Sequence, residues 1–399
     1  MLNSAKSTEL STGTGASIYT QSANSFDQSL YSNNVSSLKG SSQSVESQGL
    51  NPNPNLIFSS AAINPDFNGD GKTDKIWRNS QTGEVAVWLM DGATPNGVAL
   101  PSRGAEWDYK IADLNGDGKT DLIWRNKNTG ANEAWVMDGG NIVADTMLTS
   151  TDSNWDFKVG DTNADRKSDL IWHNKSTGEN AVWVMDGTNI ASAAMLPTTD
   201  ANWTSTVVSV DGTGKTDLLW HNSATGQNSL WSMNGTELSS GTELANFGAG
   251  SEWQVSATDF NGDMRTDLFW HNTKTGQNTT WLMNGTNATA ADLPTQGAGS
   301  DWKYEFGDVN NDGKIDILWR NEATGENLGW TMDGATATAT ALPTMSSDWK
   351  SSLGDFNGDG RTELFWNNTK TGENMIWSGD GTTTAVNTTP LGWYTTSVG

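Results

Sequence analysis

One sequence unit of about 48 residues returns seven times along this chain. It starts with an acidic string, as in DFNGDGKTDKIWRN from Asp66, and runs to the next such string. A fixed period of this length predicts a repeat architecture, in which each copy is one supersecondary unit that packs against its neighbours. The later copies begin, at offsets of 47, 48, 48, 50, 49 and 47 residues, at Asp113, Asp161, Ser209, Asp259, Asp308 and Asp355.

The 21 tryptophans divide evenly among the seven copies. One follows the acidic string, one stands 11 residues later, and one lies six residues before the next string. The segments around them, such as DLIWRN and NAVWVM, are rich in β-branched and aromatic residues and are separated by glycine turns, which is typical of β-strands. Four short strands per copy predict an all-β, seven-bladed β-propeller of four-stranded blades. An open β-solenoid is the alternative, but its repeat is normally much shorter.

The two ends of the repeat region indicate how the ring closes. The first copy lacks its Trp-led strand, because Ser60 stands where the tryptophan is expected. The chain ends with GWYTTSVG, a Trp-led segment that no acidic string follows. We therefore expect residues 392–399 to supply the missing strand of the first blade. Residues 56–64 compete for that place, but Pro65 directly after them disfavours a paired strand there.

The first 50 residues differ from the rest of the chain in composition. They hold 14 Ser, no Trp and only five charged side chains, which is too little apolar surface for independent folding. The sequence NPNPN at 51–55 is typical of a stiff, extended hinge, because each proline fixes its own φ and biases the preceding residue toward extended geometry. We predict an extended N-terminal arm and hinge over residues 1–55 and a propeller over residues 56–399.

The acidic strings have the pattern D-x-N-G-D-G-x-x-D, with oxygen ligands at positions one, three, five and nine and a backbone carbonyl at position seven. Ca²⁺ takes about six to eight oxygens at ~2.3–2.6 Å, whereas Mg²⁺ prefers smaller octahedral sites that keep several waters. Glycines at positions four and six permit left-handed backbone that turns these oxygens inward. The spacing is that of the start of an EF-hand loop without its twelfth-position Glu. The strings therefore predict calcium-binding β-hairpins.

The predicted ligands, in which each basic residue contributes only its carbonyl, are Asp66, Asn68, Asp70, Lys72, Asp74, Asp113, Asn115, Asp117, Lys119, Asp121, Asp161, Asn163, Asp165, Lys167, Asp169, Asp259, Asn261, Asp263, Arg265, Asp267, Asp308, Asn310, Asp312, Lys314, Asp316, Asp355, Asn357, Asp359, Arg361 and Glu363. The fourth string, Ser209 to Asp217, keeps only two carboxylates, and we expect its site to be weak or empty. This leaves about six calcium ions. The alternative is that the strings are only Asx-rich hairpin turns, but three carboxylates within nine residues repel one another without a cation.

The net charge of −24, from 23 Lys+Arg and 47 Asp+Glu, argues against a nucleic-acid partner, because such binding usually needs a basic face. Six calcium ions would halve this charge. The absence of cysteine excludes disulfides, a thiolate nucleophile and Cys-type zinc sites. No apolar run approaches the roughly 18 residues that span a bilayer, so no membrane span is expected. The N-terminus has no recognisable signal peptide pattern.

The repeated units resemble FG-GAP/VCBS repeats over roughly residues 56–399. The resemblance rests on the acidic string, the strand that follows it and the MDG or MNG turn. Members of this family include integrin α-chain propellers, bacterial surface proteins and a seven-bladed mushroom lectin. The resemblance implies a seven-bladed propeller with calcium hairpins on one rim. It does not imply a single function, since members adhere, bind sugars or act as scaffolds.

A second recurring position follows the first tryptophan of each copy, and all three histidines of the chain stand at it. Because strand side chains alternate, this residue faces away from the tryptophan. One interpretation is a ring of sugar-binding pockets between blades. The other is that these side chains tie adjacent blades together through backbone carbonyls. The candidate ligand-binding residues are Arg78, Arg125, His173, His221, His271 and Arg320.

Catalytic motifs are not evident, because the chain has no GxSxG or HExxH sequence and every His has a place in the repeat. We expect a non-enzymatic protein that is extracellular or on the cell surface. The first hypothesis is a self-assembling structural protein, in which residues 1–50 contact a neighbouring subunit and build a homopolymer. The alternative is a lectin or adhesin whose partners are glycans or cell-surface proteins.

Overall fold

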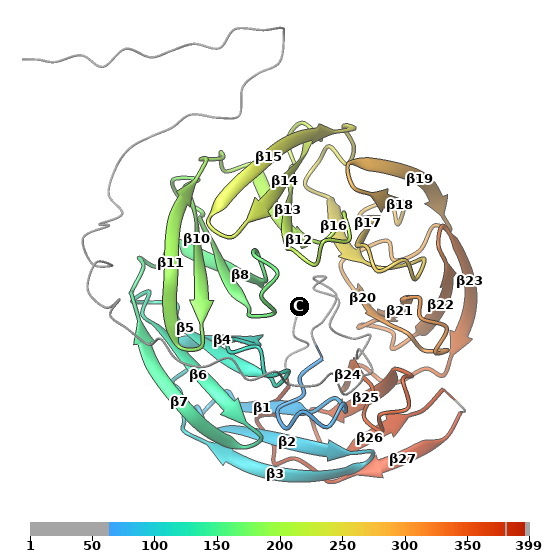
Figure 1. Ribbon diagram of the computed structural model, residues 1–399. Coiled ribbons are helices and arrows are strands. Elements are labelled where there is room, and N and C mark those ends of the chain that lie inside the picture. Colours follow the sequence, from blue (N-terminus) through green and yellow to red (C-terminus); the bar gives the residue numbers. More distant parts are fainter. Residues whose placement is uncertain (1–63, 380, 396–399) are drawn as a thin grey trace, which may run out of the picture.

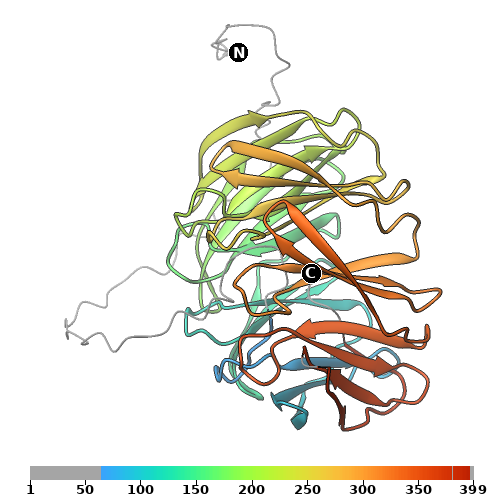
Figure 2. The same ribbon diagram turned by 90° about the vertical axis from the view of Figure 1, so that its right-hand side faces the viewer.

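The computed structural model describes residues 64–379 and 381–395, which form seven four-stranded antiparallel sheets arranged in a ring (Figure 1). The prediction of an all-β, seven-bladed propeller is therefore confirmed. In the view turned by 90° the ring is seen from its side, and the sheets of neighbouring blades lie face to face (Figure 2). The predicted arm and hinge, residues 1–55, lie outside the described residues. Within the described residues, no helix is long and apolar enough to cross a membrane.

Each blade has the same order of strands from the axis outward. The innermost, Trp-led strands are β4 (Trp107–Ala112), β8 (Trp155–Gly160), β12 (Trp203–Val208), β16 (Trp253–Thr258), β20 (Trp302–Gly307), β24 (Trp349–Gly354) and β28 (Trp393–Tyr394). The second strands are β1 (Lys75–Asn79), β5 (Asp121–Asn126), β9 (Asp169–Asn174), β13 (Asp217–Asn222), β17 (Asp267–Asn272), β21 (Asp316–Asn321) and β25 (Glu363–Asn368).

The third strands are β2 (Val85–Asp91), β6 (Asn132–Asp138), β10 (Asn180–Asp186), β14 (Asn228–Asn234), β18 (Asn278–Asn284), β22 (Asn327–Asp333) and β26 (Asn374–Trp377). The outermost strands are β3 (Thr94–Leu100), β7 (Asn141–Leu148), β11 (Asn189–Leu196), β15 (Glu237–Leu244), β19 (Asn287–Leu293), β23 (Thr336–Leu342) and β27 (Thr383–Val386). Blade 1 consists of β28 and β1–β3, and blades 2 to 7 follow in chain order.

Blade 1 closes the ring with strands from both ends of the repeat region. The sheet order is β28-β1-β2-β3, and the register pairs Arg78 with Tyr394 and Asn79 with Trp393. The C-terminal Trp-led segment thus completes the first blade, as the sequence predicted. The competing segment lies outside the described residues except for Asn64. Pairing the last strand with the first blade joins the two ends of the ring through a ladder of backbone hydrogen bonds.

The core lies between blades rather than within one central cluster. Seven clusters of buried apolar side chains occur among the described residues, and each is shared by two adjacent blades. The second strands are buried on both faces, whereas the outermost strands are mostly exposed. The tryptophan of each second strand is at most 1% exposed. Large aromatic side chains at a fixed strand position therefore form the contact between sheets, as expected for inter-sheet core.

An asparagine ends every second strand and shapes the hairpin that follows. In blade 1 the Asn79 side-chain oxygen accepts hydrogen bonds from the N–H groups of Gln81 at 2.9 Å and Thr82 at 3.1 Å. Gly83 closes the turn at φ 73°, where a Cβ would lie 2.3 Å from the Arg103 carbonyl oxygen. The Asn-x-x-x-Gly pattern is thus an Asx-type turn with a glycine that no other residue can replace without strain.

Candidate functional site

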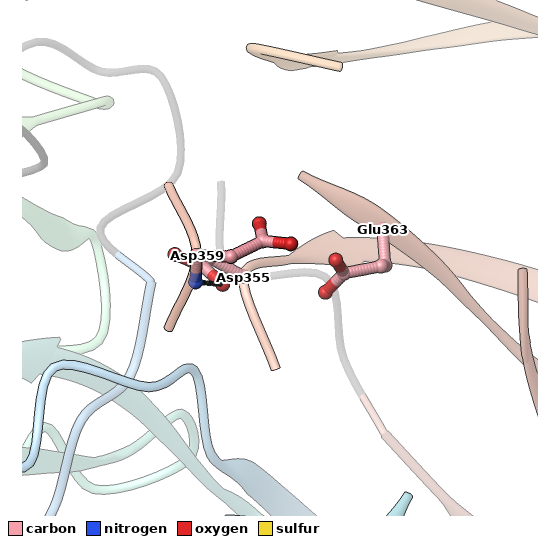
Figure 3. A group of neighbouring side chains, drawn as sticks. All are labelled: Asp355, Asp359 and Glu363. Atoms are coloured by element: carbon pink, nitrogen blue, oxygen red, sulfur yellow. Dashed lines mark hydrogen bonds between the residues drawn. The ribbon is translucent and has the colours of Figure 1, made fainter. Parts of the chain in front are cut away.

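The acidic loops lie between the first and second strands of blades 2 to 7, with the loop of blade 1 directly before β1. In the seventh loop, oxygens of Asp355, Asp359 and Glu363 all lie within 4.8 Å of one another. Figure 3 shows Glu363 projecting from β25 toward the two aspartates of the loop. In the described part of the chain, the three carboxylates of the other loops do not come as close together. The longer glutamate side chain accounts for this difference.

Loop one shows how the backbone orients the ligands. The two carboxylate oxygens of Asp66 accept hydrogen bonds from the N–H groups of Gly69 at 2.7 Å and Gly71 at 2.8 Å. The side-chain oxygen of Asn68 accepts one from Asp70, and a carboxylate oxygen of Asp70 accepts one from Lys72, both at 3.0 Å. Asp66 Oδ1 also accepts the Asp70 N–H at 3.2 Å. Asp66 Oδ2, Asn68 Oδ1 and Asp70 Oδ1 each accept one of these hydrogen bonds and retain a further lone pair. The predicted side-chain ligands are thus held in a cup with acceptor capacity left for a cation.

The ninth-position carboxylate anchors the loop to the sheet. Asp74 accepts hydrogen bonds from the backbone N–H groups of Phe67 and Met90, both at 2.8 Å. The pKa of Asp74 is raised to about 7, mainly by burial and to a smaller extent by the carboxylates of Asp66 and Asp70, although these two hydrogen bonds lower it. A divalent cation would neutralise such a cluster of like charges. The donor set and the crowding therefore fit calcium.

The same burial effect recurs at the ninth position of four more predicted calcium loops. It raises the pKa of Asp121 and Asp267 to about 7 and that of Asp169 and Asp316 to about 6.

Three loops adopt left-handed backbone at positions that do not carry glycine. Ala164 and Arg166 in loop three have φ values of 62° and 68°, Met264 in loop five has 63°, and Asn311 in loop six has 59°. Such a conformation costs about 1–2 kcal/mol per residue for non-glycine residues. The loop shape is thus kept even where its sequence disfavours it, which indicates that the cup geometry is required.

Loop four differs from the others in its polar groups. Ser209 and Thr213 stand where most loops carry the first and fifth aspartates, and one carboxylate oxygen of Asp217 is buried without a hydrogen-bond partner in the described structure. In loop one the equivalent oxygen accepts the Phe67 N–H. The prediction of a weak or empty fourth site stays a prediction, and this geometry is consistent with it.

Each acidic loop is also tied to the next blade. The N–H of Asp66 donates to the Thr120 hydroxyl at 2.7 Å, and the N–H of Thr120 donates to the Asp66 carbonyl at 2.8 Å. The Lys119 ammonium pairs with Asp138 at 2.5 Å, and its side chain packs against Gly69 of the neighbouring loop. An ion bound in one loop would therefore stabilise the contact between two blades.

The polar residues after the first tryptophan lie at the opposite rim, because each second strand runs from its acidic loop to its hairpin. Arg125 donates to the carbonyls of Asp152 at 2.8 Å, in the connection to the next blade, and of Trp155 at 2.6 Å, where that blade begins. Its guanidinium also stacks on Trp172, 5.2 Å from the ring centre. Arg78 and Arg320 bond the equivalent carbonyls of their next blades. These three arginines are clamps between blades.

Two histidines are covered by longer connections. After the blades that carry His221 and His271, the Trp of the next blade follows the end of the outermost strand by nine residues. At the other five interfaces it follows by seven residues. The longer connections carry Gly-Ala-Gly, and a Cβ on Gly248 or Gly297 would collide with the tryptophan of the next blade. His221 and His271 are therefore only 3% and 2% exposed.

His173 combines the short connection with the short side chain. Neither a guanidinium nor a Gly-Ala-Gly segment fills the space between blades 3 and 4, and a cavity of about 310 Å³ is found there. His173 is half-buried in its wall, and its ring packs on Trp220 of blade 4 at 5.5 Å. The imidazole Nδ1 shares a hydrogen bond of 2.7 Å with the Asn180 side-chain oxygen. Burial lowers the pKa of His173, so that the ring is neutral at pH 7.

His173 shares its position in the repeat with five other candidate residues, and that position alone does not single out this interface. A signal for it exists in the sequence: His173 is the histidine whose connection, PTTDAN, is two residues shorter than those behind the other two. Lys110, Lys158 and Lys175 line the same cavity and were not among the candidate residues.

Comparisons with known proteins agree with this architecture. Residues 66–124, 113–172 and 259–319 match the family described as FG-GAP-like repeat. No curated protein matches the chain. A lectin from Agrocybe aegerita that recognises non-reducing terminal N-acetylglucosamine matches in structure with a TM-score of 0.66 and 14% identity, over 79% of this chain and 90% of the lectin.

Two enzymes also share the propeller. Prolyl oligopeptidase B from Galerina marginata has a TM-score of 0.54 at 11% identity, over 85% of this chain and 53% of the enzyme. A post-proline cleaving enzyme from Rickettsia typhi has a TM-score of 0.52 at 12% identity, over 84% of this chain and 54% of the enzyme. At such identities the likeness shows the fold alone. This chain thus carries FG-GAP-like repeats within a seven-bladed β-propeller.

Proposed function

We propose that this chain is a non-catalytic, calcium-stabilised propeller that binds a saccharide between blades 3 and 4, outside the cell or on its surface. The observation that carries this proposal is the cavity beside His173. A small-molecule site is normally a concave pocket with mostly apolar and aromatic walls and a few fixed polar groups. This cavity has both kinds of wall.

The aromatic wall suits the apolar face of a sugar ring. Trp172, Trp203 and Trp220 line the cavity together with Phe157. The polar groups suit sugar hydroxyls, which both donate and accept hydrogen bonds. They include the His173 imidazole and the side chains of Asn180, Thr204 and Ser205. A volume of about 310 Å³ lies at the lower end of the roughly 300–1,000 Å³ of ligand pockets, and it suits one sugar ring.

Calcium has a structural role in this proposal. The acidic loops lie at the rim opposite to His173, since β9 begins in its loop at Asp169 and ends at Asn174. Bound ions would tie the blades together without contacting the saccharide. Calcium sites of extracellular modules have dissociation constants of ~10⁻⁴–10⁻³ M. Because the chain has no cysteine, calcium would take the place of disulfides in stabilising the fold. The lectin that shares the propeller is a further support for a glycan ligand.

The experiment is a glycan array with the full chain in calcium-containing buffer. We expect one class of glycan to bind, and we expect His173→Arg to abolish that binding. Arginine with a six-residue connection is the combination that blades 1, 2 and 6 use to fill this space, so the variant should remain folded. A matched control is Lys303→Met, on the exposed surface of β20. The absence of any glycan signal, or an unchanged signal in His173→Arg, would contradict the proposal.

Self-assembly through residues 1–50 stays a prediction, because that segment lies outside the described residues. Deleting it and measuring particle size by light scattering tests the prediction independently of glycan binding. A deletion variant that polymerises like the full chain would reject it.

A further inference from the structure

Three lysines converge on the cavity between blades 3 and 4. Lys158 comes from β8 of blade 3, Lys110 from β4 of blade 2, and Lys175 from the hairpin after β9. The one carboxylate in the cavity wall, Asp156, is already paired with Lys175 at 2.7 Å. Two ammonium groups therefore line the cavity with no carboxylate at ion-pair distance among the described residues.

The surroundings of these two lysines make their charge costly. The Lys110 ammonium stands over the Phe157 ring, 5.5 Å from its centre, which compensates a positive charge only in part. Burial and, after it, the like charge of Lys110 lower the pKa of Lys158 to about 8, against an opposing effect of the Asp156 carboxylate. Burial is also the main cause that lowers the pKa of Lys110. A bound anion would relieve both the desolvation and the repulsion.

The lysines are particular to this side of the ring. Lys110 and Lys158 stand at the fourth position of the innermost strand, where the other four complete innermost strands carry uncharged or acidic residues, namely Thr206, Ser256, Glu305 and Ser352. The repeat therefore does not require a basic residue at this position. The unfilled interface and the lysines in its wall thus coincide between blades 3 and 4.

We infer that the cavity selects an acidic saccharide, a sugar ring that carries a carboxylate or a sulfate. This inference rests on the proposed function and adds the chemical class of its ligand. The sugar ring lies against the tryptophan wall, and its anionic group pairs with Lys158 and Lys110. The chain as a whole carries a net charge of −24, which repels anions at long range. Selectivity for an acid must therefore come from these local charges.

The test is titration calorimetry of the full chain in calcium buffer with glucuronic acid and with glucose, which differ only in the carboxylate at C6. We expect glucuronic acid to bind at least about tenfold more tightly, since charge-assisted hydrogen bonds are roughly twice as strong as neutral ones. Glucose 6-sulfate distinguishes the two anions: binding as tight as that of glucuronic acid shows that either group is accepted, and weaker binding shows preference for a carboxylate.

The matched variants are Lys158→Met, which keeps the length of the side chain without its charge, and Lys303→Met on blade 6. We expect Lys158→Met to reduce the affinity for glucuronic acid toward that for glucose, because Lys110 alone remains for the anion, and to leave glucose binding unchanged, with Lys303→Met altering neither. Equal affinities for the two sugars, unchanged by Lys158→Met, would overturn the inference and leave the proposed function intact. Absence of all sugar binding in the parent chain would instead overturn the proposed function. Circular dichroism confirms that each variant is folded, and Lys158→Gln is the second choice.

Discussion

Thr73 in the first acidic loop and Asp355 in the seventh exchange two hydrogen bonds, although 282 residues separate them in sequence. The N–H of Asp355 donates to the Thr73 hydroxyl at 2.9 Å, and the N–H of Thr73 donates to the Asp355 carbonyl at 2.6 Å. The Thr73 methyl packs against Gly354, where a Cβ would collide with it. Together with the β1–β28 pairing, this contact closes the ring at the rim of the acidic loops.

Replacing Thr73 by Val keeps the methyl group and removes the hydroxyl, so that the buried N–H of Asp355 loses its acceptor. We expect the free energy of unfolding to fall by about 1–3 kcal/mol, measured by urea denaturation. The matched control is Thr120→Val, which removes the same hydrogen bond between blades 1 and 2. A loss in Thr120→Val without a loss in Thr73→Val would show that the ring is not closed through this contact.

Calcium removal tests the acidic loops as a set. We expect about six calcium ions to bind per chain, and we expect a chelator to lower the melting temperature, since each site filled at 100 times its dissociation constant stabilises the fold by about 2.7 kcal/mol. Asp355→Ser should bind one ion fewer in equilibrium dialysis. Its control is Asp211→Ser in loop four, which should not change the number. A melting temperature that a chelator leaves unchanged would contradict the calcium prediction.

The pH dependence of stability isolates Asp217, which belongs to the loop that we expect to be empty. Burial raises the pKa of Asp217 from 3.8 to about 7 in the folded state. The folded chain then binds this proton more tightly than the unfolded chain, so that the free energy of unfolding falls as the pH rises from about 4 to 7.

Asp217→Asn removes this titration. Between pH 5 and pH 8 we expect the stability of the variant relative to the parent to rise by on the order of 2 kcal/mol, measured by chemical denaturation in saturating calcium. The amide oxygen of the introduced asparagine can still accept the Met233 N–H. The change of the stability difference with pH is informative even if the substitution also shifts stability by an amount that does not depend on pH. Parallel curves for parent and variant would show that Asp217 is ionised throughout.

Arg125 tests the clamps at the other rim. Its guanidinium makes five hydrogen bonds to groups of blades 2 and 3, including the side chains of Asn132 at 2.9 Å and Thr151 at 2.8 Å. We expect Arg125→Met to lower the free energy of unfolding by about 3 kcal/mol, because buried carbonyls and a hydroxyl lose a charged donor. Arg125→Lys should restore little, since one ammonium cannot reach so many acceptors. Lys127→Met, on the exposed hairpin next to it, is the control.

The ring could be predicted from the sequence because its period repeats seven times, and the closing strand because GWYTTSVG has no acidic string after it. The left-handed backbone of the loops could be predicted where it falls on a glycine, as at Gly69 and Gly71, but not where it falls on Asn311. The cavity beside His173 could not be predicted in the same way. It depends on what neighbouring blades leave unfilled, which is a difference between repeats rather than a property that they share. The clustering of Lys110 with Lys158 likewise needs the contact between blades 2 and 3.

The length of the connection between blades should decide whether the cavity exists. Residues 294–301, which join blades 5 and 6, begin with Pro-Thr as residues 197–202 do, and they are two residues longer. Replacing residues 197–202 by a copy of residues 294–301 places Gly-Ala-Gly over His173, as it lies over His271 in the chain itself. We expect this variant to keep the parent's melting temperature within a few degrees and to lose saccharide binding in titration calorimetry. As a control, an exchange of Thr198 for Ser within the short connection keeps its length and should keep binding. Binding that survives the longer connection would show that the saccharide site lies elsewhere on the propeller.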